Sequence, residues 1–326
     1  MRNLFEPRLA FKPYEYPELI GFKDAIRKSY WVHSEYNYTP DIQDYKVNLN
    51  LEEREVIRRC MLAISQIEVT VKRFWADIYY KFPKPEVDAV GVTFAESEVR
   101  HADAYSSILE LLGINDDFTK IHEIPALMGR VDYMQKFMKD KNLDDQHFVL
   151  SIILFSMFIE HISLFSQFVI MMSFNKYRNQ FKGLSNAIQA TAKEEEIHGN
   201  FGVEIFKILH IENRELFTDE FYSDLLELSK DAFKAEMDII DWIYETTDLS
   251  FMPKDSVKEY VKSRYNKSLT TLGVNFEYPI NKELLKPTEF FDVEVLAPVE
   301  HDFFNKRSVD YTKRGADSEV DDDWFN

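Results

Sequence analysis

The feature that most restricts the fold of this chain is one arrangement of acids and histidines that occurs twice. In each copy a glutamate and a histidine stand three residues apart, at Glu98-Val99-Arg100-His101 and at Glu195-Glu196-Ile197-His198. Each copy follows a lone acid in an apolar stretch by a similar interval, Glu68 in the first case and Glu160 in the second. Residues three apart share one face of a helix. The sequence therefore predicts four helices that bring six side chains to one place.

The rest of the chain also favours helices. The 326 residues are enough for a large core, only 9 are glycine, and no segment alternates polar and apolar residues as strands do. The spacing of apolar residues predicts helices over 51–80, 86–112, 124–140, 145–175, 184–211, 219–246 and 254–272. We predict an all-α fold, a ferritin-like helical bundle in which four carboxylates and two imidazoles form a dinuclear metal site.

Composition divides the chain into three parts. Residues 1–50 are rich in proline and aromatic residues and are expected to wrap around the bundle. Residues 51–285 form the ferritin-like helical domain, and residues 286–326 form a C-terminal segment. Its last ten residues carry five acids, no bases and the pair Trp324-Phe325. We expect this flexible tail to be disordered by itself.

Charge and composition argue against several classes of function. A net charge of −18 disfavours nucleic acid and anionic membranes as partners. The N-terminus lacks the pattern of a signal peptide, and the most apolar segment, residues 148–174, is interrupted by Glu160 and His161. We therefore expect a cytoplasmic protein with no membrane span. The single cysteine, Cys60, excludes dithiol chemistry within one chain.

Glu160 is the strongest single indication of a metal site. It is the only acid between Asp145 and Glu194, and it follows the apolar run 152–159. An unpaired carboxylate in such surroundings is costly, so it needs a cation, a hydrogen-bond network or a proton. The alternative is a buried glutamate paired with a basic residue.

The second Glu-x-x-His copy leaves a choice of ligand, because residues 194–196 are all glutamates. The three-residue step to His198 selects Glu195. Glu194 then becomes an acceptor for the outer nitrogen of a ligand imidazole, as such sites require. His161 adjoins Glu160 but points elsewhere on the helix, so we leave it out of the site.

This set of donors suits hard metal ions. Four carboxylates and two imidazoles favour iron or manganese over copper or structural zinc, and the four negative charges balance two divalent ions. Such a centre can activate reduced oxygen species and hold a strong oxidant away from water. Tyr105 lies on the helix face of Glu98 and His101, where it can give an electron and a proton to an oxidised centre. The alternative for Tyr105 is a core tyrosine.

These residues resemble the small, radical-generating subunit of class I ribonucleotide reductase. The similarity extends over nearly the whole chain: Trp31, Glu68, Glu98-x-x-His101-x-x-x-Tyr105, Glu160, Glu195-x-x-His198, Phe303-Phe304-x-x-Arg307-x-x-x-Tyr311 and an acidic aromatic tail.

The resemblance implies that the six residues bind two metals and that their oxidation yields a stable one-electron oxidant. The oxidising equivalent would travel through Trp31 and Tyr311 to a cysteine in a separate large subunit, where ribonucleoside diphosphates or triphosphates are reduced. The tail would be the docking peptide for that large subunit. We also expect two ions per chain and a homodimer.

Glu68 bears on the metal, because most of the family has aspartate there and the branches with glutamate tend to use manganese. The resemblance thus favours two manganese ions, with two iron ions or a Mn/Fe pair as alternatives. In those branches the metals can keep the oxidant themselves, sometimes despite an intact tyrosine. Lys72 lies one turn from Glu68, and our hypothesis is that its ammonium group attracts a small anion such as superoxide. The alternative is an ordinary ion pair with Glu68.

Three other functions are compatible with parts of the pattern. A stand-alone ferritin-like oxidase or hydroxylase would share all six ligands but need no docking tail. An iron-storage protein would form a cage and mineralise many ions per chain. A purely structural helical protein would have to satisfy Glu160 and Glu195 without metal.

Overall fold

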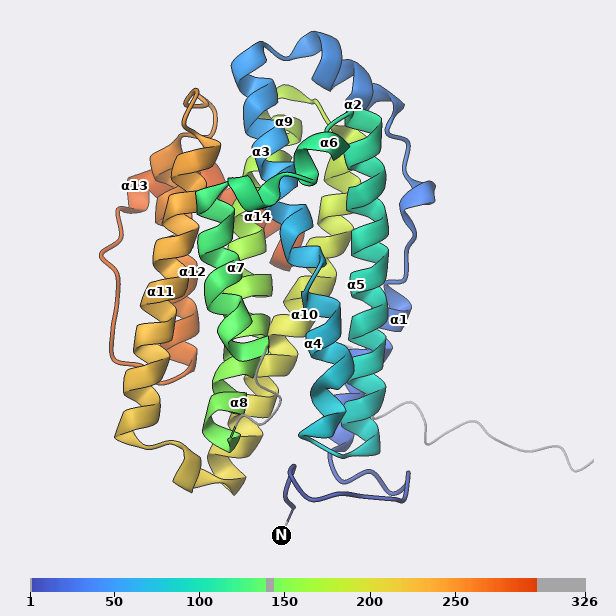
Figure 1. Ribbon diagram of the computed structural model, residues 1–326, viewed down its shortest axis with the longest axis vertical. Coiled ribbons are helices and arrows are strands. Elements are labelled where there is room, and N and C mark those ends of the chain that lie inside the picture. Colours follow the sequence, from blue (N-terminus) through green and yellow to red (C-terminus); the bar gives the residue numbers. More distant parts are fainter. Residues whose placement is uncertain (1, 139–143, 298–326) are drawn as a thin grey trace, which may run out of the picture.

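The structure is a computed structural model that describes residues 2–138 and 144–297, and these residues form a helical bundle (Figure 1). The α-helices are α1 (Pro17–Lys28), α2 (Thr39–Gln43), α3 (Leu51–Glu68), α4 (Val71–Asp77), α5 (Pro85–Leu112), α6 (Asn115–Phe118), α7 (Pro125–Met138), α8 (Asp145–Ile153), α9 (Leu164–Arg178), α10 (Lys182–Glu212), α11 (Asp219–Ile243), α12 (Lys254–Thr271), α13 (Lys282–Leu285) and α14 (Glu289–Phe291). Within the described residues, the only β pairing is an isolated bridge between Leu249 and Met252. The predicted all-α class is confirmed.

Local sequence explains where the long helices begin and end. The Asn50 side chain accepts a hydrogen bond from the Glu53 backbone, and Glu53 reaches back to Asn50, so a capping box starts α3. Helix α5 begins at Pro85 and ends before Gly113, whose φ of 79° is readily adopted only by glycine. Helix α10 receives its cap from α2, where Asp41 accepts the backbone N–H groups of Gly183 and Leu184.

The helix expected over residues 51–80 is interrupted, which corrects that prediction. Helix α3 ends at Glu68, and α4 starts at Val71. At the break, the backbone N–H and the hydroxyl of Thr70 both donate to the carbonyl of Ile67, at 2.9 and 3.0 Å. This local bonding replaces the regular helical ladder. The break leaves Glu68 at the end of α3 and gives α4 its own position beside α5.

The helix expected over residues 145–175 extends to Arg178 but is not regular. Between α8 and α9, residues Leu154–Ser163 (η5) are π-helical, and Glu160 lies inside this stretch. Such π-helical turns are rare and occur often at functional sites. Gly202 lets helix α10 pack closely on η5: a Cβ at this position would lie only 1.9 Å from the Ser156 hydroxyl oxygen.

The most apolar helix belongs to the core of the bundle. The continuous stretch Asp145–Arg178 is long and apolar enough to cross a membrane, yet 94% of its most apolar window is buried inside the protein. Burial of this kind is typical of a core helix.

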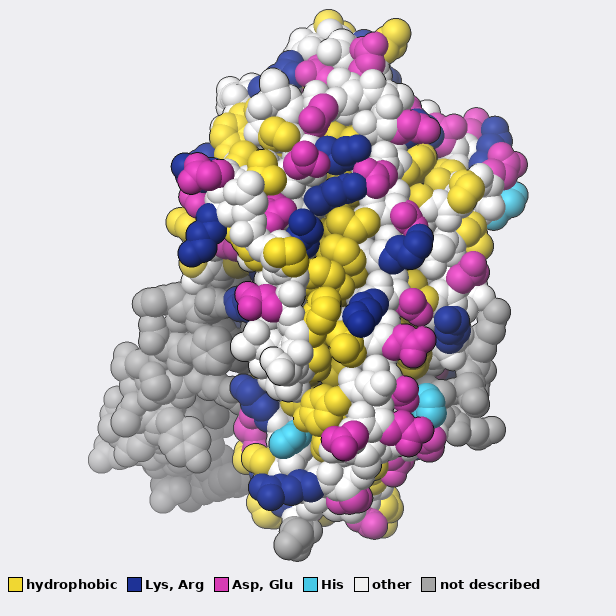
Figure 2. Space-filling model, turned by 90° about the vertical axis from the view of Figure 1, so that its left-hand side faces the viewer, with side chains coloured by type: hydrophobic (Ala, Val, Ile, Leu, Met, Phe, Trp, Pro, Cys, Tyr) yellow, Lys and Arg dark blue, Asp and Glu magenta, His cyan; other side chains and the backbone are white. Residues whose placement is uncertain are grey.

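On the face that Figure 2 shows, basic and acidic side chains are interspersed around a hydrophobic stripe.

Candidate metal centre

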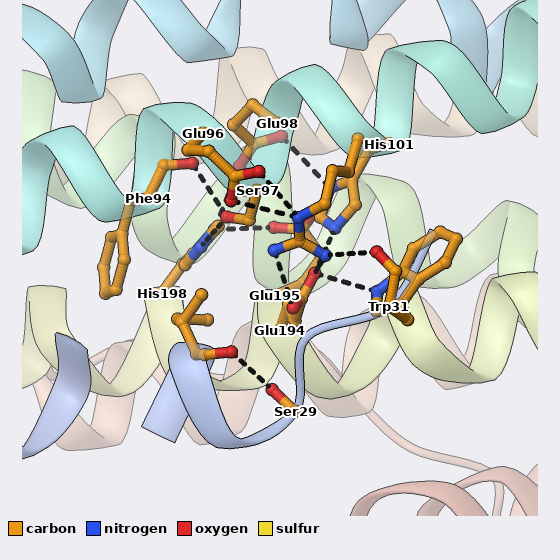
Figure 3. Close-up of polar contacts among 12 residues, drawn as sticks. Ser29, Trp31, Phe94, Glu96, Ser97, Glu98, His101, Glu194, Glu195 and His198 are labelled. Carbon is orange, nitrogen blue, oxygen red and sulfur yellow. Dashed lines mark hydrogen bonds and ion pairs between the residues drawn. The ribbon is translucent and has the colours of Figure 1, made fainter. Parts of the chain in front are cut away.

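Four helical segments bring the six predicted ligands together in the core. Glu68 ends α3, Glu98 and His101 lie on α5, Glu160 lies in η5, and Glu195 and His198 lie on α10. All six side chains are buried, with at most 2% of any residue exposed. Figure 3 shows the α5 and α10 members facing each other. The six residues that the spacing selected therefore lie on helix faces that converge in the core.

The six side chains form two overlapping groups, each able to surround one ion. Their possible ligand atoms lie within 4.8 Å of one another in each group. Two carboxylates, Glu98 and Glu195, belong to both groups. The two groups are Glu68, Glu98, His101 and Glu195, and Glu98, Glu160, Glu195 and His198. Shared carboxylates between two quartets define a buried site of the dimetal type.

Both imidazoles direct Nδ1 into the cluster, because their outer nitrogens have other partners. His101 Nε2 lies 2.8 Å from Glu194 Oε2, and a carboxylate oxygen there accepts the hydrogen bond. His198 Nε2 lies 3.2 Å from the Ser97 hydroxyl oxygen, whose own proton goes to the Phe94 carbonyl. Each Nε2 is thus the donor, and each Nδ1 presents a lone pair to a metal.

The residues present fit a pair of cations. Six buried carboxylate oxygens have no hydrogen-bond partner among the described residues. One is Glu86 Oε2, and the other five belong to the cluster: Glu68 Oε1, Glu68 Oε2, Glu98 Oε1, Glu160 Oε2 and Glu195 Oε1. A buried oxygen without a donor is costly unless a cation or proton is bound to it. The five cluster oxygens belong to the four acids that the sequence pattern selected, and three of them lie 3.0–3.5 Å from a histidine Nδ1.

Burial and mutual proximity shift the protonation of the cluster. Burial raises the pKa of Glu68 well above its usual range, and the nearby Glu98 adds to the effect. Burial likewise raises the pKa of Glu160 to about 8. For His101 and His198, burial lowers the pKa, but the surrounding carboxylates outweigh it and raise both values. Protons and metal ions therefore compete for these donors.

Glu194 links the cluster to Trp31. The Trp31 indole N–H donates to Glu194 Oε2 at 3.1 Å, and the same oxygen accepts from His101. The Trp31 ring stacks on His101 with centroids 6.0 Å apart. Arg100 binds both Glu194 oxygens, at 3.0 and 3.2 Å, and also donates to the Trp31 carbonyl. Figure 3 shows Trp31 and His101 beside Glu194, which accepts a hydrogen bond from each.

Tyr105 and Lys72 lie next to the cluster in different ways. Tyr105 is buried, its hydroxyl has no hydrogen-bond partner among the described residues, and burial raises its pKa well above the usual range. Lys72 is half-buried and donates to the backbone carbonyl of Glu68 at 2.5 Å. The alternative of an ordinary Lys72–Glu68 side-chain pair is not what the structure shows. Tyr311 and the tail lie outside the described residues.

Three residues that contact the cluster or Glu194 were not predicted from the sequence: Trp75, Ser97 and Arg100. Trp75 donates its indole N–H to Glu160 Oε1 at 2.6 Å across a separation of 85 residues. No spacing rule connects residues on separate helices in this way. Ser97 and Arg100 are adjacent to predicted ligands, and that adjacency was the only available signal.

A helical bundle with a buried carboxylate and histidine cluster of this kind defines a ferritin-like dimetal protein. The profile of the family described as "Ribonucleotide reductase, small chain" matches residues 8–284. The chain belongs to this family, as its motifs predicted.

Relatives and solved structures agree with the family. The chain is 25% identical to the probable ribonucleoside-diphosphate reductase small subunit of invertebrate iridescent virus 6, over 98% of both chains. It is 23% identical to the ribonucleoside-diphosphate reductase subunit beta of Chlamydia pneumoniae, over 87% of this chain and 84% of the relative. The fold is similar to that of a putative class I ribonucleotide reductase from Bacillus halodurans, with a TM-score of 0.75, 17% identity and coverage of 85% and 99%.

Another group of proteins shares the fold. An R2-like ligand-binding oxidase solved with a Mn/Fe cofactor superimposes with a TM-score of 0.68 at 18% identity, over 81% of this chain and 96% of that one. At this level of identity the similarity concerns the fold alone.

Proposed function

We propose that this chain is the small subunit of a cytoplasmic ribonucleoside-diphosphate reductase, active with a separate large catalytic subunit. The observation that carries the proposal is the pair of ligand groups that share Glu98 and Glu195, with the Trp31–Glu194–His101 contact beside them. The family to which the chain belongs supports the reaction. The five cluster oxygens without a hydrogen-bond partner support a resident metal pair.

The metal ligands in this proposal are Glu68, Glu98, His101, Glu160, Glu195 and His198. A metal pair bound there would supply a strong one-electron oxidant after activation by a reduced oxygen species. We favour two manganese ions, with two iron ions or a Mn/Fe pair as alternatives. The protein contributes buried surroundings, imidazoles oriented through Nε2, and carboxylates whose charge balances the two ions.

Trp31 is the exit point for the oxidising equivalent. If Trp31 gave an electron to an oxidised metal pair, its Nε1 proton would move along the existing hydrogen bond to Glu194 Oε2, and no charge would be left on the buried ring. Arg100 donates to both Glu194 oxygens and so fixes the carboxylate beside the Trp31 N–H. Tyr311 would carry the equivalent onward to the large subunit.

Tyr105 and Lys72 have supporting roles in the proposal. Tyr105 is an internal donor of one electron, because its ring is buried beside the cluster and its phenol is kept protonated. Lys72 attracts a small anionic oxidant such as superoxide towards the Glu68 side. Replacing Lys72 with Met should slow activation by superoxide and leave the metal content unchanged, and equal activation rates would remove Lys72 from the mechanism.

The large subunit is recruited by the C-terminal tail, and the chain acts as a homodimer. We propose the same division as in the sequence: a wrapping segment over 1–50, the ferritin-like domain over 51–285, and a C-terminal segment over 286–326. A shortened chain lacking residues 307–326 should lose ribonucleotide reduction with the large subunit and keep oxidation of its metals. Full reductase activity in the shortened chain would contradict the proposal.

The same experiment separates the reductase from an oxidase of the R2-like type, whose fold is similar. An oxidase would act on a small substrate without a large subunit, and it would be indifferent to removal of the tail. Electron paramagnetic resonance of the activated protein then identifies the oxidant. A sharp tyrosyl signal that disappears in Tyr105→Phe assigns it to Tyr105, whereas a manganese multiline spectrum assigns it to the metals.

A further inference from the structure

The two lone acids of the cluster differ in their hydrogen bonds. Both oxygens of Glu68 are buried without a hydrogen-bond partner among the described residues. Glu160 has only one such oxygen, Oε2, because Oε1 accepts the indole N–H of Trp75 at 2.6 Å. Both oxygens of Glu68 are therefore free of hydrogen bonds, whereas at Glu160 only Oε2 is free and Oε1 is held by the indole.

Trp75 is held in place by its surroundings. Its side chain is fully buried, and its ring packs edge-on against Phe94, with centroids 5.1 Å apart, and against Phe201 at 5.8 Å. The ring centroid lies 5.6 Å from that of His198. A tryptophan enclosed in this way has little freedom to turn its N–H away from Glu160.

A glycine on α5 lets the backbone of Trp75 come this close. A Cβ at Gly91 would lie 2.6 Å from the Trp75 carbonyl oxygen and 2.5 Å from the Ile78 side chain. Only glycine fits there without moving α4 away from α5. The break after α3 and this contact together aim the indole at the cluster.

We propose that Trp75 is a positioning residue: its N–H fixes Glu160 as a one-oxygen ligand and makes the two metal positions unequal. The position next to His198 then has a rigid carboxylate, and the position next to His101 has a carboxylate, Glu68, that is free to change its binding mode. This inference rests on the proposed dimetal function. Trp31 acts differently, because its N–H bonds to Glu194, which is not among the predicted ligands.

The test is binding of Mn²⁺ to the full chain without oxygen, for the unmodified protein and for Trp75→Phe. Equilibrium dialysis gives the affinity of each ion, and electron paramagnetic resonance distinguishes a coupled manganese pair from a single ion. Loss of a partner that orients a ligand typically weakens metal binding by about tenfold or more. We expect a loss of about that size for one ion in Trp75→Phe, with the other ion almost unaffected and the coupled signal replaced by that of a single ion.

Two control variants isolate the hydrogen bond. Trp242→Phe makes the same chemical change on α11, where the ring lies under the Arg59 guanidinium, and it should bind both ions as the unmodified protein does. Phe74→Leu disturbs the ring that packs on Trp75 at 5.2 Å but leaves the N–H in place, so it should also keep both ions.

Each outcome decides a different point. Identical binding of both ions in Trp75→Phe and the unmodified protein would overturn the inference, and so would an equal loss of both ions. Failure of the unmodified protein to bind a metal pair would instead overturn the proposed function, and this inference with it.

If Trp75→Phe does not fold, nuclear magnetic resonance of the unmodified protein tests whether the Trp75–Glu160 hydrogen bond persists when metal binds. In the unmodified protein, the indole N–H resonance of Trp75 should lie far downfield, as expected for a short hydrogen bond to a carboxylate. It should remain there when diamagnetic Zn²⁺ is added. Movement to the position of a free indole would show that Glu160 leaves Trp75 on metal binding, and the inference would be wrong.

Discussion

Arg100 offers a sharp test of how the Trp31 side of the centre is held. This guanidinium, 5% exposed, contacts two glutamates in very different surroundings. It lies 3.0 Å from Glu194, which is fully buried, and 3.0 Å from Glu96, whose side chain is 47% exposed. One arginine thus makes a buried and an exposed ion pair at the same distance. The two pairs should differ strongly in energy.

The magnitude follows from burial. At 3.0 Å and an effective dielectric constant of about 20, the attraction between Arg100 and Glu194 is roughly 5 kcal/mol. Removing one partner of a buried pair generally costs about 3–5 kcal/mol because the other charge stays buried. Glu194 keeps its bonds to Trp31 and His101, so we expect Arg100→Met to cost about 3 kcal/mol. Glu96→Gln should cost under about 1 kcal/mol.

Guanidinium denaturation of the metal-free protein measures both costs. With a slope of about 6 kcal/mol per molar for a chain of this size, Arg100→Met should lower the midpoint by about 0.5 M. The double variant Arg100→Met with Glu194→Gln should recover much of this loss, because no unpaired buried charge remains.

Two results would refute the reasoning. One is a cost for Arg100→Met no larger than that for Glu96→Gln. The other is a double variant that is less stable than Arg100→Met alone. Either result would mean that the Arg100–Glu194 contact does not hold a buried charge.

Further predictions concern packing, pH and metal. Gly202→Ala should lower the free energy of unfolding by about 1–3 kcal/mol in thermal or chemical denaturation, because the new Cβ would clash with the Ser156 hydroxyl, and an unchanged stability would contradict the close packing of α10 on η5. Hydrogen bonds from Arg58 and then Arg59 lower the pKa of Glu55 to about 2 from 4.5. Its contribution to stability is therefore present above about pH 4.5 and lost as the pH falls towards about 2, so Glu55→Gln should weaken the pH dependence of unfolding in that window. Mn²⁺ at about 100 times its dissociation constant should stabilise the fold by roughly 2.7 kcal/mol in thermal unfolding, a gain that a chelator should reverse and that substitution of Glu160 should reduce.

The sequence by itself determined the helices and the faces of the helices that carry the acids. Apolar spacing and the Glu-x-x-His steps depend on residues a few positions apart, and the helix geometry that they share is local. For this reason α5, α10, α11 and α12 appear close to their expected bounds. The same local geometry explains why the ligand set could be chosen before the helices were placed in space.

The spacing of apolar residues could not predict where the helices depart from regular geometry. The break between α3 and α4 depends on the competing bonds of Thr70, and the π-helical stretch around Glu160 occurs where α10 comes close through Gly202. A period of 3.6 residues predicts a straight helix through both places. The apolar pattern is the same whether or not the helix is interrupted.

Only the tertiary structure decided which groups complete the centre. Trp75 reaches Glu160 across 85 residues. Trp31, from the segment after α1, and Arg100, from α5, meet at Glu194. Contacts of this kind depend on the distance and angle between helices, which are set by packing over the whole core. Periodicity fixes the direction in which a side chain leaves its own helix, and packing alone fixes which neighbour it meets there.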